Sequence, residues 1–256
     1  MTSRRVAVVT GASSGIGTEI ARSLAGRGWL CVLLARRRER LEALAAELGG
    51  EAEACDVSDR EGVEATAEAV LARHPAVHLL VNNAGIPGRD SFLALNPEHV
   101  EELVRTNYLG GVWCLRAFLS GLERAAPSDV VNVVSIAGAV AYPPSGPYAA
   151  AKAAQLAFSR ATAVELRSRG IRVHTVNPGL VHTEGFPNRD RFRHPLWPRL
   201  VLDPERVAEH AVSLVGSGRV ETFVPAWYRA GAILQTLLPG TFGLLLGGAG
   251  LAKLKR

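Results

Sequence analysis

The sequence is poor in cysteine and in lysine, and these shortages narrow the class of protein. Its three cysteines, Cys31, Cys55 and Cys114, are an odd number in apolar surroundings and form no CxxC pair. We therefore expect reduced core thiols in a cytoplasmic protein, and neither a disulfide framework nor a zinc site. The seven histidines show no metal-ligand spacing, so no metal is expected.

Concentrated basic charge is also missing, although the net charge is +5. The arginines are scattered apart from Arg36-Arg37-Arg38 with Arg40, and a smaller group within 189–199. No basic helix interleaved with aromatic residues is present, so we do not expect nucleic-acid binding. Repeats of solenoid period and low-complexity tracts are absent, and we expect no signal peptide ahead of the first strand.

What the chain does contain is a regular alternation of two patterns. Short β-branched runs lie at 6–9, 30–34, 77–81, 130–134, 171–176 and 220–224, and helical patterns lie at 15–27, 38–48, 60–73, 97–122, 148–168 and 204–215. This alternation predicts an α/β fold, a doubly wound parallel β-sheet of the Rossmann type with helices on both faces. Because no linker interrupts the alternation, we expect one domain over residues 1–256.

A glycine-rich segment follows the first expected strand: Thr10-Gly11-Ala12-Ser13-Ser14-Gly15-Ile16-Gly17. Glycines permit a tight turn and let backbone N–H groups approach an anion at a helix N-terminus, where the helix dipole favours negative charge. A strand before the segment, a helix after it and a second strand beyond are the context of a dinucleotide site. We therefore expect a pyrophosphate there; the alternative is a purely structural turn.

Arg36 follows the second expected strand, at the position that faces the adenosine ribose in a dinucleotide fold. An acidic residue there would bind the 2′-hydroxyl of NAD, whereas an arginine accommodates the 2′-phosphate of NADP. The sequence thus favours NADP(H) over NAD(H). Arg36 could instead be a solvated residue at the start of the next helix, which is how we interpret Arg37, Arg38 and Arg40.

A tyrosine and a lysine stand four residues apart in Tyr148-Ala-Ala-Ala-Lys152, with Ser135 at the end of a preceding strand. Positions i and i+4 share one helix face, so the ammonium can lie beneath the phenol. A nearby cation favours phenolate and lowers a pKa that starts near about 10. Such a tyrosine can exchange a proton with an alcohol or carbonyl oxygen.

Taken in order, these motifs resemble those of the short-chain dehydrogenase/reductases in their single-domain form. The resemblance covers residues 5–225. It also includes Asp56-Val57, Asn82-Asn83-Ala84-Gly85, Asn107, Asn177-Pro178-Gly179 and Thr183. No member of the family's catalytic set is missing.

The resemblance implies a role for each catalytic candidate. Tyr148 is the general acid in carbonyl reduction and the general base in alcohol oxidation. Lys152 lowers the pKa of Tyr148 and binds the nicotinamide ribose, and Ser135 steadies the substrate oxygen. Asn107 lies at a helix kink and helps hold a water that links Lys152 to solvent. Alternatively, Asn107 only satisfies backbone groups.

The resemblance also implies a set of cofactor contacts. Asp56 and Val57 contact the adenine, unless Asp56 only caps a turn. Asn83, Ala84 and Gly85 border the cofactor. Alternatively, Asn82 and Asn83 are architectural and bond neighbouring strands, which is how we interpret Asn82. Pro178-Gly179 begins the loop beside the nicotinamide. The backbone near Val181 and the Thr183 hydroxyl fit its carboxamide and phosphate side.

Two segments bear on the substrate. Residues 184–202 correspond to the substrate lid, where Phe186, Phe192, Leu196 and Trp197 suggest an apolar wall. Residues 226–256 form an apolar extension in which 230–252 carries no charge. Glycines and Pro239 interrupt this segment, and a spanning helix would violate the positive-inside tendency. We expect either a tail docked over a subunit interface or the substrate pocket, or a peripheral membrane contact.

The sequence therefore predicts an NADP(H)-dependent oxidoreductase that interconverts a carbonyl and a secondary alcohol on an apolar small molecule. One alternative is a catalytically idle NADPH-binding regulator or scaffold. Another is a membrane-associated ketoreductase of lipid-type substrates. The resemblance implies a homodimer or homotetramer, and the cysteine usage favours the cytoplasm.

Overall fold

A single seven-stranded sheet organises the chain in the computed structural model, which describes residues 4–88, 96–143, 145–184 and 201–241. The strand order is β3-β2-β1-β4-β5-β6-β7, and every neighbouring pair is parallel. The strands are β1 Val6–Thr10, β2 Leu30–Ala35, β3 Glu51–Ala54, β4 Leu79–Asn82, β5 Ser128–Val133, β6 Ile171–Pro178 and β7 Glu221–Val224. The doubly wound prediction is confirmed.

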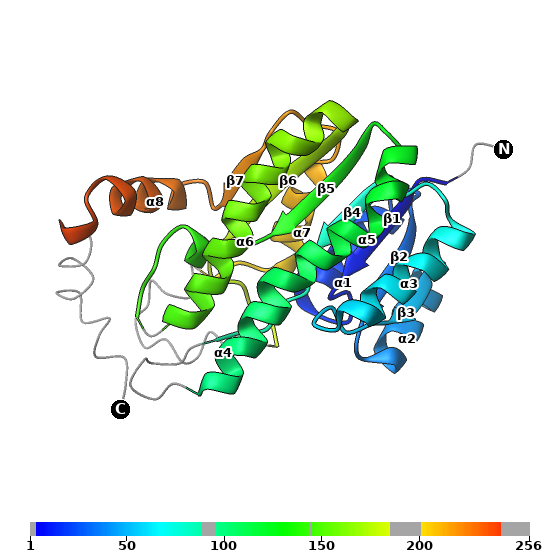
Figure 1. Ribbon diagram of the computed structural model, residues 1–256, viewed down its shortest axis with the longest axis horizontal. Coiled ribbons are helices and arrows are strands. Elements are labelled where there is room, and N and C mark those ends of the chain that lie inside the picture. The colour runs from blue at the N-terminus through cyan, green and yellow to red at the C-terminus, as the bar shows by residue number, and fades with distance from the viewer. Residues whose placement is uncertain (1–3, 89–95, 144, 185–200, 242–256) are drawn as a thin grey trace.

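Helices connect these strands and cover both faces of the sheet (Figure 1). They are α1 Gly15–Ala25, α2 Arg38–Leu48, α3 Arg60–Arg73, α4 Pro97–Val104, α5 Gly110–Arg124, α6 Gly146–Glu165, α7 Pro204–Ser213 and α8 Tyr228–Leu237. Short turns add η2 Arg105–Leu109, η3 Ile136–Gly138 and η4 Leu166–Arg169. In Figure 1, α5 and α6 cross in front of the sheet, with α1 and α7 behind it.

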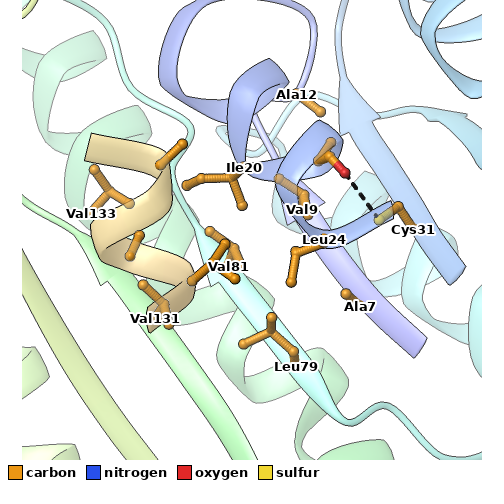
Figure 2. Close-up of a cluster of buried hydrophobic side chains, with 14 of the residues drawn as sticks. Ala7, Val9, Ala12, Ile20, Leu24, Cys31, Leu79, Val81, Val131 and Val133 are labelled. Carbon is orange, nitrogen blue, oxygen red and sulfur yellow. Dashed lines mark hydrogen bonds between the residues drawn. The ribbon is translucent and has the colours of Figure 1, made fainter. Parts of the chain in front are cut away.

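The unbroken apolar runs of the strands follow from burial on two sides. Ala7 and Val9 of β1 point into a core with Ile20 and Leu24 of α1 (Figure 2), and this core continues to α2 and α7. Val8 points into a second core that includes side chains of α3 and α5. Because adjacent strand residues face opposite sides of the sheet, a strand buried on both faces must be apolar at every position.

Two features of the structure differ from the sequence-based prediction: one strand was not predicted, and one predicted helix is divided. β3, Glu-Ala-Glu-Ala, lies at the sheet edge and lacks the β-branched residues that marked the other strands. The helix predicted over 97–122 is divided, because Arg105–Leu109 forms a π-helical turn between α4 and α5. A π-helical turn leaves the spacing of apolar residues on either side intact, so the sequence pattern alone predicts one continuous helix.

A buried ionic cluster lies at the amino ends of β5 and β6. The Asp129 carboxylate accepts two hydrogen bonds from Arg172, both at 2.8 Å, one from the Gly216 backbone at 3.1 Å, and contacts His174 Nε2 at 2.8 Å. Burial by itself would raise the pKa of Asp129, but the hydrogen bonds from Arg172, His174 and Gly216 lower it to about 2. The charged carboxylate therefore stabilises the fold at neutral pH.

We expect Asp129→Asn to lower the free energy of unfolding at pH 7 by about 3 kcal/mol, because it leaves Arg172 and His174 without their buried counter-charge. Urea unfolding measures this loss. Because the folded pKa is depressed, the contribution is present above about pH 4 and disappears as the pH falls towards 2. Glu123→Gln breaks an exposed pair with Arg169 and serves as the control. A loss no larger than in that control would contradict the prediction.

Candidate active site

A cleft of about 500 Å³ opens at the carboxyl ends of the strands. It lies where the strand order reverses between β1 and β4, the place at which open α/β sheets bind ligands. Its lining includes almost all of the residues that the sequence singled out: Gly11, Ser13, Ser14, Gly15, Ile16, Arg36, Asp56, Val57, Asn83, Ala84, Gly85, Asn107, Ser135, Tyr148, Lys152, Pro178, Gly179, Val181 and Thr183. Among the residues expected to act in catalysis or to contact the cofactor, the exception is Gly17.

The glycine loop is held against the end of β4 by Thr10. The Thr10 hydroxyl accepts hydrogen bonds from the Asn83 and Ala84 backbone N–H groups, both at 3.0 Å, and donates to the Val81 carbonyl at 3.1 Å. Gly11 adopts a positive φ of 66°, which favours glycine. The loop therefore has the backbone shape that a pyrophosphate cradle needs.

Gly17 lies behind the loop and not on the cleft surface. A Cβ at this position would stand 2.3 Å from the Gly11 carbonyl oxygen and 2.5 Å from Asn83 Nδ2. The absence of a side chain lets helix α1 approach the loop closely, which aims its N-terminus at the cleft. The role of Gly17 is to position the loop.

At the adenosine end, more than one arginine reaches the cleft. Arg36 lies 3.8 Å from Asp56, which also accepts hydrogen bonds from the Ser58 backbone and hydroxyl. Arg37 donates to the Ser13 hydroxyl at 3.1 Å and to Glu184 at 2.7 Å. Arg37 is exposed at the start of α2, as interpreted, but it also contacts the glycine loop and Glu184, which the sequence pattern did not predict. Three successive arginines directly after a strand were the available signal.

Ser135 and Tyr148 meet at the opposite end of the cleft. Ser135 caps η3, and its hydroxyl oxygen accepts a hydrogen bond from the Ala137 backbone at 3.1 Å. The same hydroxyl lies beside the Tyr148 phenol and by itself lowers the pKa of Tyr148. Ser135 is thus fixed by the backbone beside Tyr148, and its expected contact with a substrate oxygen stays a prediction.

The expected effect of Lys152 on Tyr148 is not found in this structure. Lys152 Nζ lies 6.0 Å from the centre of the Tyr148 ring and donates to Gln155 Oε1 at 2.9 Å and to the Val133 carbonyl at 3.4 Å. Burial raises the pKa of Tyr148 to about 12, and burial lowers the pKa of Lys152 to about 7. Desolvation disfavours both charged forms and outweighs the attraction between them.

Asn107 ties the π-helical turn to the loop after β4. Its Oδ1 accepts from the Ile86 backbone N–H at 2.9 Å, and its Nδ2 donates to the Ile86 carbonyl at 3.0 Å. A Cβ on Gly85 would lie 2.6 Å from Asn107 Oδ1 and 3.6 Å from Lys152 Nζ. The side-chain amide thus satisfies backbone groups, as the alternative stated, and it does so beside Lys152.

A chain of buried polar groups supports this end of the sheet. Asn82 donates to the Asn132 amide oxygen at 2.9 Å, and Asn132 donates to the Ser159 hydroxyl at 2.8 Å. Ser159 in turn hydrogen-bonds Thr175 at 2.6 Å. The chain joins β4, β5, α6 and β6, so the architectural role expected for Asn82 is what the structure shows.

Helix α8 packs against the loop that follows β6. A Cβ on Gly179 would lie 2.2 Å from the Tyr228 ring, and the Tyr228 hydroxyl lies near the Leu180 backbone. Gln235 makes two hydrogen bonds with the Ala141 backbone, at 2.8 and 3.2 Å. The uncharged extension therefore begins as a helix docked on two loops beside the cleft, a role for Tyr228 and Gln235 that the sequence pattern did not indicate.

Several predictions concern residues beyond those described. The lid residues Phe186, Phe192, Leu196 and Trp197 and all of the tail after Thr241 lie outside the described residues. Among the described helices, none is both long and apolar enough to cross a membrane. Within the same residues, no cluster of His, Cys, Asp and Glu could hold a metal ion.

The sequence matches known proteins of one family. The short chain dehydrogenase family model matches residues 5–193, and the chain belongs to this family. The chain is 36% identical to a 3-oxoacyl-[acyl-carrier-protein] reductase of Bos taurus, over 70% of this chain and 77% of the relative. It is 39% identical to a farnesol dehydrogenase of Aedes aegypti, over 72% and 80%.

Solved structures agree with this assignment. An actinorhodin polyketide ketoreductase variant with NADPH superposes with a TM-score of 0.80 at 31% identity, covering 89% of this chain and 99% of that one. A short-chain dehydrogenase/reductase of Burkholderia phymatum in complex with NAD gives 0.80 at 25% identity, covering 91% and 93%. The protein is an oxidoreductase of alcohol and carbonyl groups, and a nicotinamide cofactor is supported.

Because no side chain fits at position 17, we expect Gly17→Ala to push α1 away from the loop at a cost of about 1–3 kcal/mol. Nicotinamide-dinucleotide binding should weaken by about tenfold or more, as measured by fluorescence titration. Gly231→Ala, at a helical position with nothing within 4 Å of the new Cβ, is the matched control and should bind normally. Equal affinities of the two variants would contradict the positioning role.

Proposed function

We propose that the protein is an NADP(H)-dependent oxidoreductase that interconverts a carbonyl and a secondary alcohol on an apolar small molecule, with Tyr148 as the general acid and base. The observation that carries the proposal is the convergence of Ser135, Tyr148 and Lys152 in the cleft that the glycine loop also lines. Dinucleotide cradle and proton donor thus face one space. A cleft of about 500 Å³ is of the size that small-molecule sites have.

The residues present fit a nicotinamide cofactor. Gly15 adopts a φ of 57°, and a Cβ there would stand 3.0 Å from the Thr183 methyl group, so a side chain would fill the cradle. Gly11, Ser13 and the N-terminus of α1 would hold the pyrophosphate, and Pro178 and Thr183 would border the nicotinamide end. When bound, the cofactor supplies the hydride.

The chain's own residues supply the proton and the orientation. In the reducing direction the Tyr148 hydroxyl gives its proton to the substrate oxygen, and in the oxidising direction it takes the proton back. Ser135, which lies beside the phenol, is placed to donate to the same oxygen as negative charge develops on it. Lys152 also lines the cleft, with its Nζ 6.0 Å from the centre of the Tyr148 ring, and burial lowers its pKa to about 7.

The apolar substrate is proposed from the substrate end of the cleft and from the relatives. Ile136, Tyr142 and Leu180 line this end together with Val134. One relative acts on farnesol by name, and a structural neighbour is a polyketide ketoreductase. Both names describe compounds with extended carbon skeletons, which such side chains would accommodate.

The contacts of α8 favour the docked-tail interpretation of the extension. Tyr228 and Gln235 bind loops that carry Gly179 and Tyr142, both cleft residues, so α8 supports the substrate end from outside. Peripheral membrane contact through 230–252, and a homodimer or homotetramer, stay predictions.

We expect Tyr148→Phe to lower the rate of NADPH-dependent carbonyl reduction by about 100-fold or more, because the variant has no proton to donate. NADPH binding should be retained, since the phenyl ring keeps the shape of the cleft. A panel of apolar ketones, followed by NADPH absorbance, measures the rate. Tyr108→Phe is the matched control, because Tyr108 packs on Phe158 and is not among the residues that line the cleft. A rate near that of the wild type in Tyr148→Phe would sink the mechanism.

We expect Arg36→Gln to weaken NADPH binding by about tenfold and to leave NADH binding unchanged, because only NADPH carries the phosphate that the guanidinium would bind. Dissociation constants from fluorescence titration compare the two cofactors. Arg38→Gln is the control, since Arg38 pairs with Glu42 on the exposed side of α2. Equal losses for both cofactors would count against a 2′-phosphate contact.

A further inference from the structure

The described structure already contains an anion between two arginines at the adenosine end of the cleft. One oxygen of the Glu184 carboxylate lies 2.7 Å from Arg37 Nη1, and the other lies 2.6 Å from Arg40 Nη1. The hydrogen bonds from Arg37 and then Arg40 lower the pKa of Glu184. The carboxylate is therefore negatively charged at neutral pH and bridges two cations one helical turn apart.

This ion-pair network joins two segments that border the glycine loop. Arg37 also donates to the Ser13 hydroxyl at 3.1 Å and to the Ser13 carbonyl at 3.3 Å. Glu184 follows Thr183, whose methyl group is the nearest neighbour of Gly15. Arg37, Ser13 and Glu184 all line the cleft. The carboxylate thus lies inside the region proposed for the adenosine half of the cofactor.

The neighbouring arginine is differently engaged. Arg36 is 3.8 Å from Asp56, beyond hydrogen-bond distance, and its side chain is 59% exposed. Arg37 and Arg40, in contrast, have their charge compensated at short distance by Glu184. Of the three cations near the loop, Arg36 is the one whose charge is available, and the other two are occupied by the chain itself.

A phosphate monoester and a carboxylate compete for such a pair of cations. The monoester carries between one and two negative charges and several acceptor oxygens, and arginine binds it through the same N–H groups. It cannot share Arg37 with Glu184 without bringing two anions into contact. Binding of the phosphate must therefore break the Glu184 pairs or leave Arg37 unused.

We propose that Glu184 is an internal competitor of the cofactor's 2′-phosphate and so sets how strongly the site prefers NADP(H) over NAD(H). This inference rests on the proposed NADP(H)-dependent function. In the absence of the phosphate, as with NAD(H), the bridge from Arg37 to Arg40 remains in place. When NADP(H) binds, Arg37 gives up its pair with the Glu184 carboxylate and pairs with the 2′-phosphate. The gain in affinity for NADP(H) is then only the difference between the free energies of these two pairs.

The test is a comparison of cofactor affinities in Glu184→Gln. The substitution removes the charge and keeps the length of the side chain, so Arg37 becomes available to the phosphate. We expect the dissociation constant of NADPH to fall by about threefold to tenfold, the size of exposed ion pairs that act as a network, and that of NADH to stay the same. Fluorescence titration at low salt measures both, and the gain should shrink in high salt.

A matched variant tests whether the gain comes from this competition or only from the loss of one negative charge near α2. Glu42→Gln also removes one negative charge near α2, but Glu42 pairs with Arg38 at 3.6 Å and does not line the cleft. It should leave the NADPH affinity at the wild-type value. A gain of similar size in Glu42→Gln would overturn the competition, because a long-range field would then account for it.

The remaining outcomes distinguish this inference from the proposed function. If the wild type binds NADPH and Glu184→Gln binds it equally well or more weakly, the competition is wrong and the proposed function stands. If Glu184→Gln gains equally for NADPH and NADH, Glu184 is not acting against the 2′-phosphate. If neither protein binds NADPH, the proposed function fails, and the inference fails with it.

Discussion

The hydrogen bonds of Thr10 hold the carboxyl ends of β1 and β4 together, and the cleft depends on this junction. The Thr10 hydroxyl accepts hydrogen bonds from two backbone N–H groups of the segment after β4. It also donates a hydrogen bond to the carbonyl of Val81 in β4. The connections after β1 and β4 lead away from this point in opposite directions, because β2 and β5 lie on opposite sides of the β1-β4 pair. Gly17 can approach only because the junction is fixed and no Cβ intervenes. Backbone geometry thus creates the cradle, and side chains then give it charge.

Desolvation governs the catalytic end of the cleft. Tyr148 and Lys152 share one face of α6, yet burial moves their pKa values in opposite directions, upwards for the phenol and downwards to about 7 for the lysine. The two shifts share one cause, since each charged form loses water. Gln155 and the Val133 carbonyl hold the ammonium, while Ser135 addresses the phenol. An i, i+4 spacing therefore fixes proximity but does not fix which group carries the charge.

Much of the fold could be predicted from sequence, because burial on both faces imposes apolar strands and the helices between them keep their spacing. The edge strand β3 was not predicted, because Glu51 and Glu53 pair with Arg73 and do not contribute apolar side chains to a core. The π-helical turn escaped because apolar spacing continues through it. Most of the site followed from motif order. Arg37 and Glu184 did not, because their pairing joins segments 147 positions apart, and no local pattern encodes such a distance.

The two ends of the cleft therefore obey different electrostatics. At the buried end, loss of water shifts the pKa values of Tyr148 and Lys152. At the exposed adenosine end, water screens each pair, so single contacts are weak and the balance among several charges matters more. Arg36, Arg37 and Arg40 together offer three cations, and Asp56 and Glu184 return two anions. Under the proposed NADP(H)-dependent function, a rim with a small net surplus of positive charge would distinguish a phosphate from a hydroxyl and still release the ligand, because each step exchanges one ion pair for another.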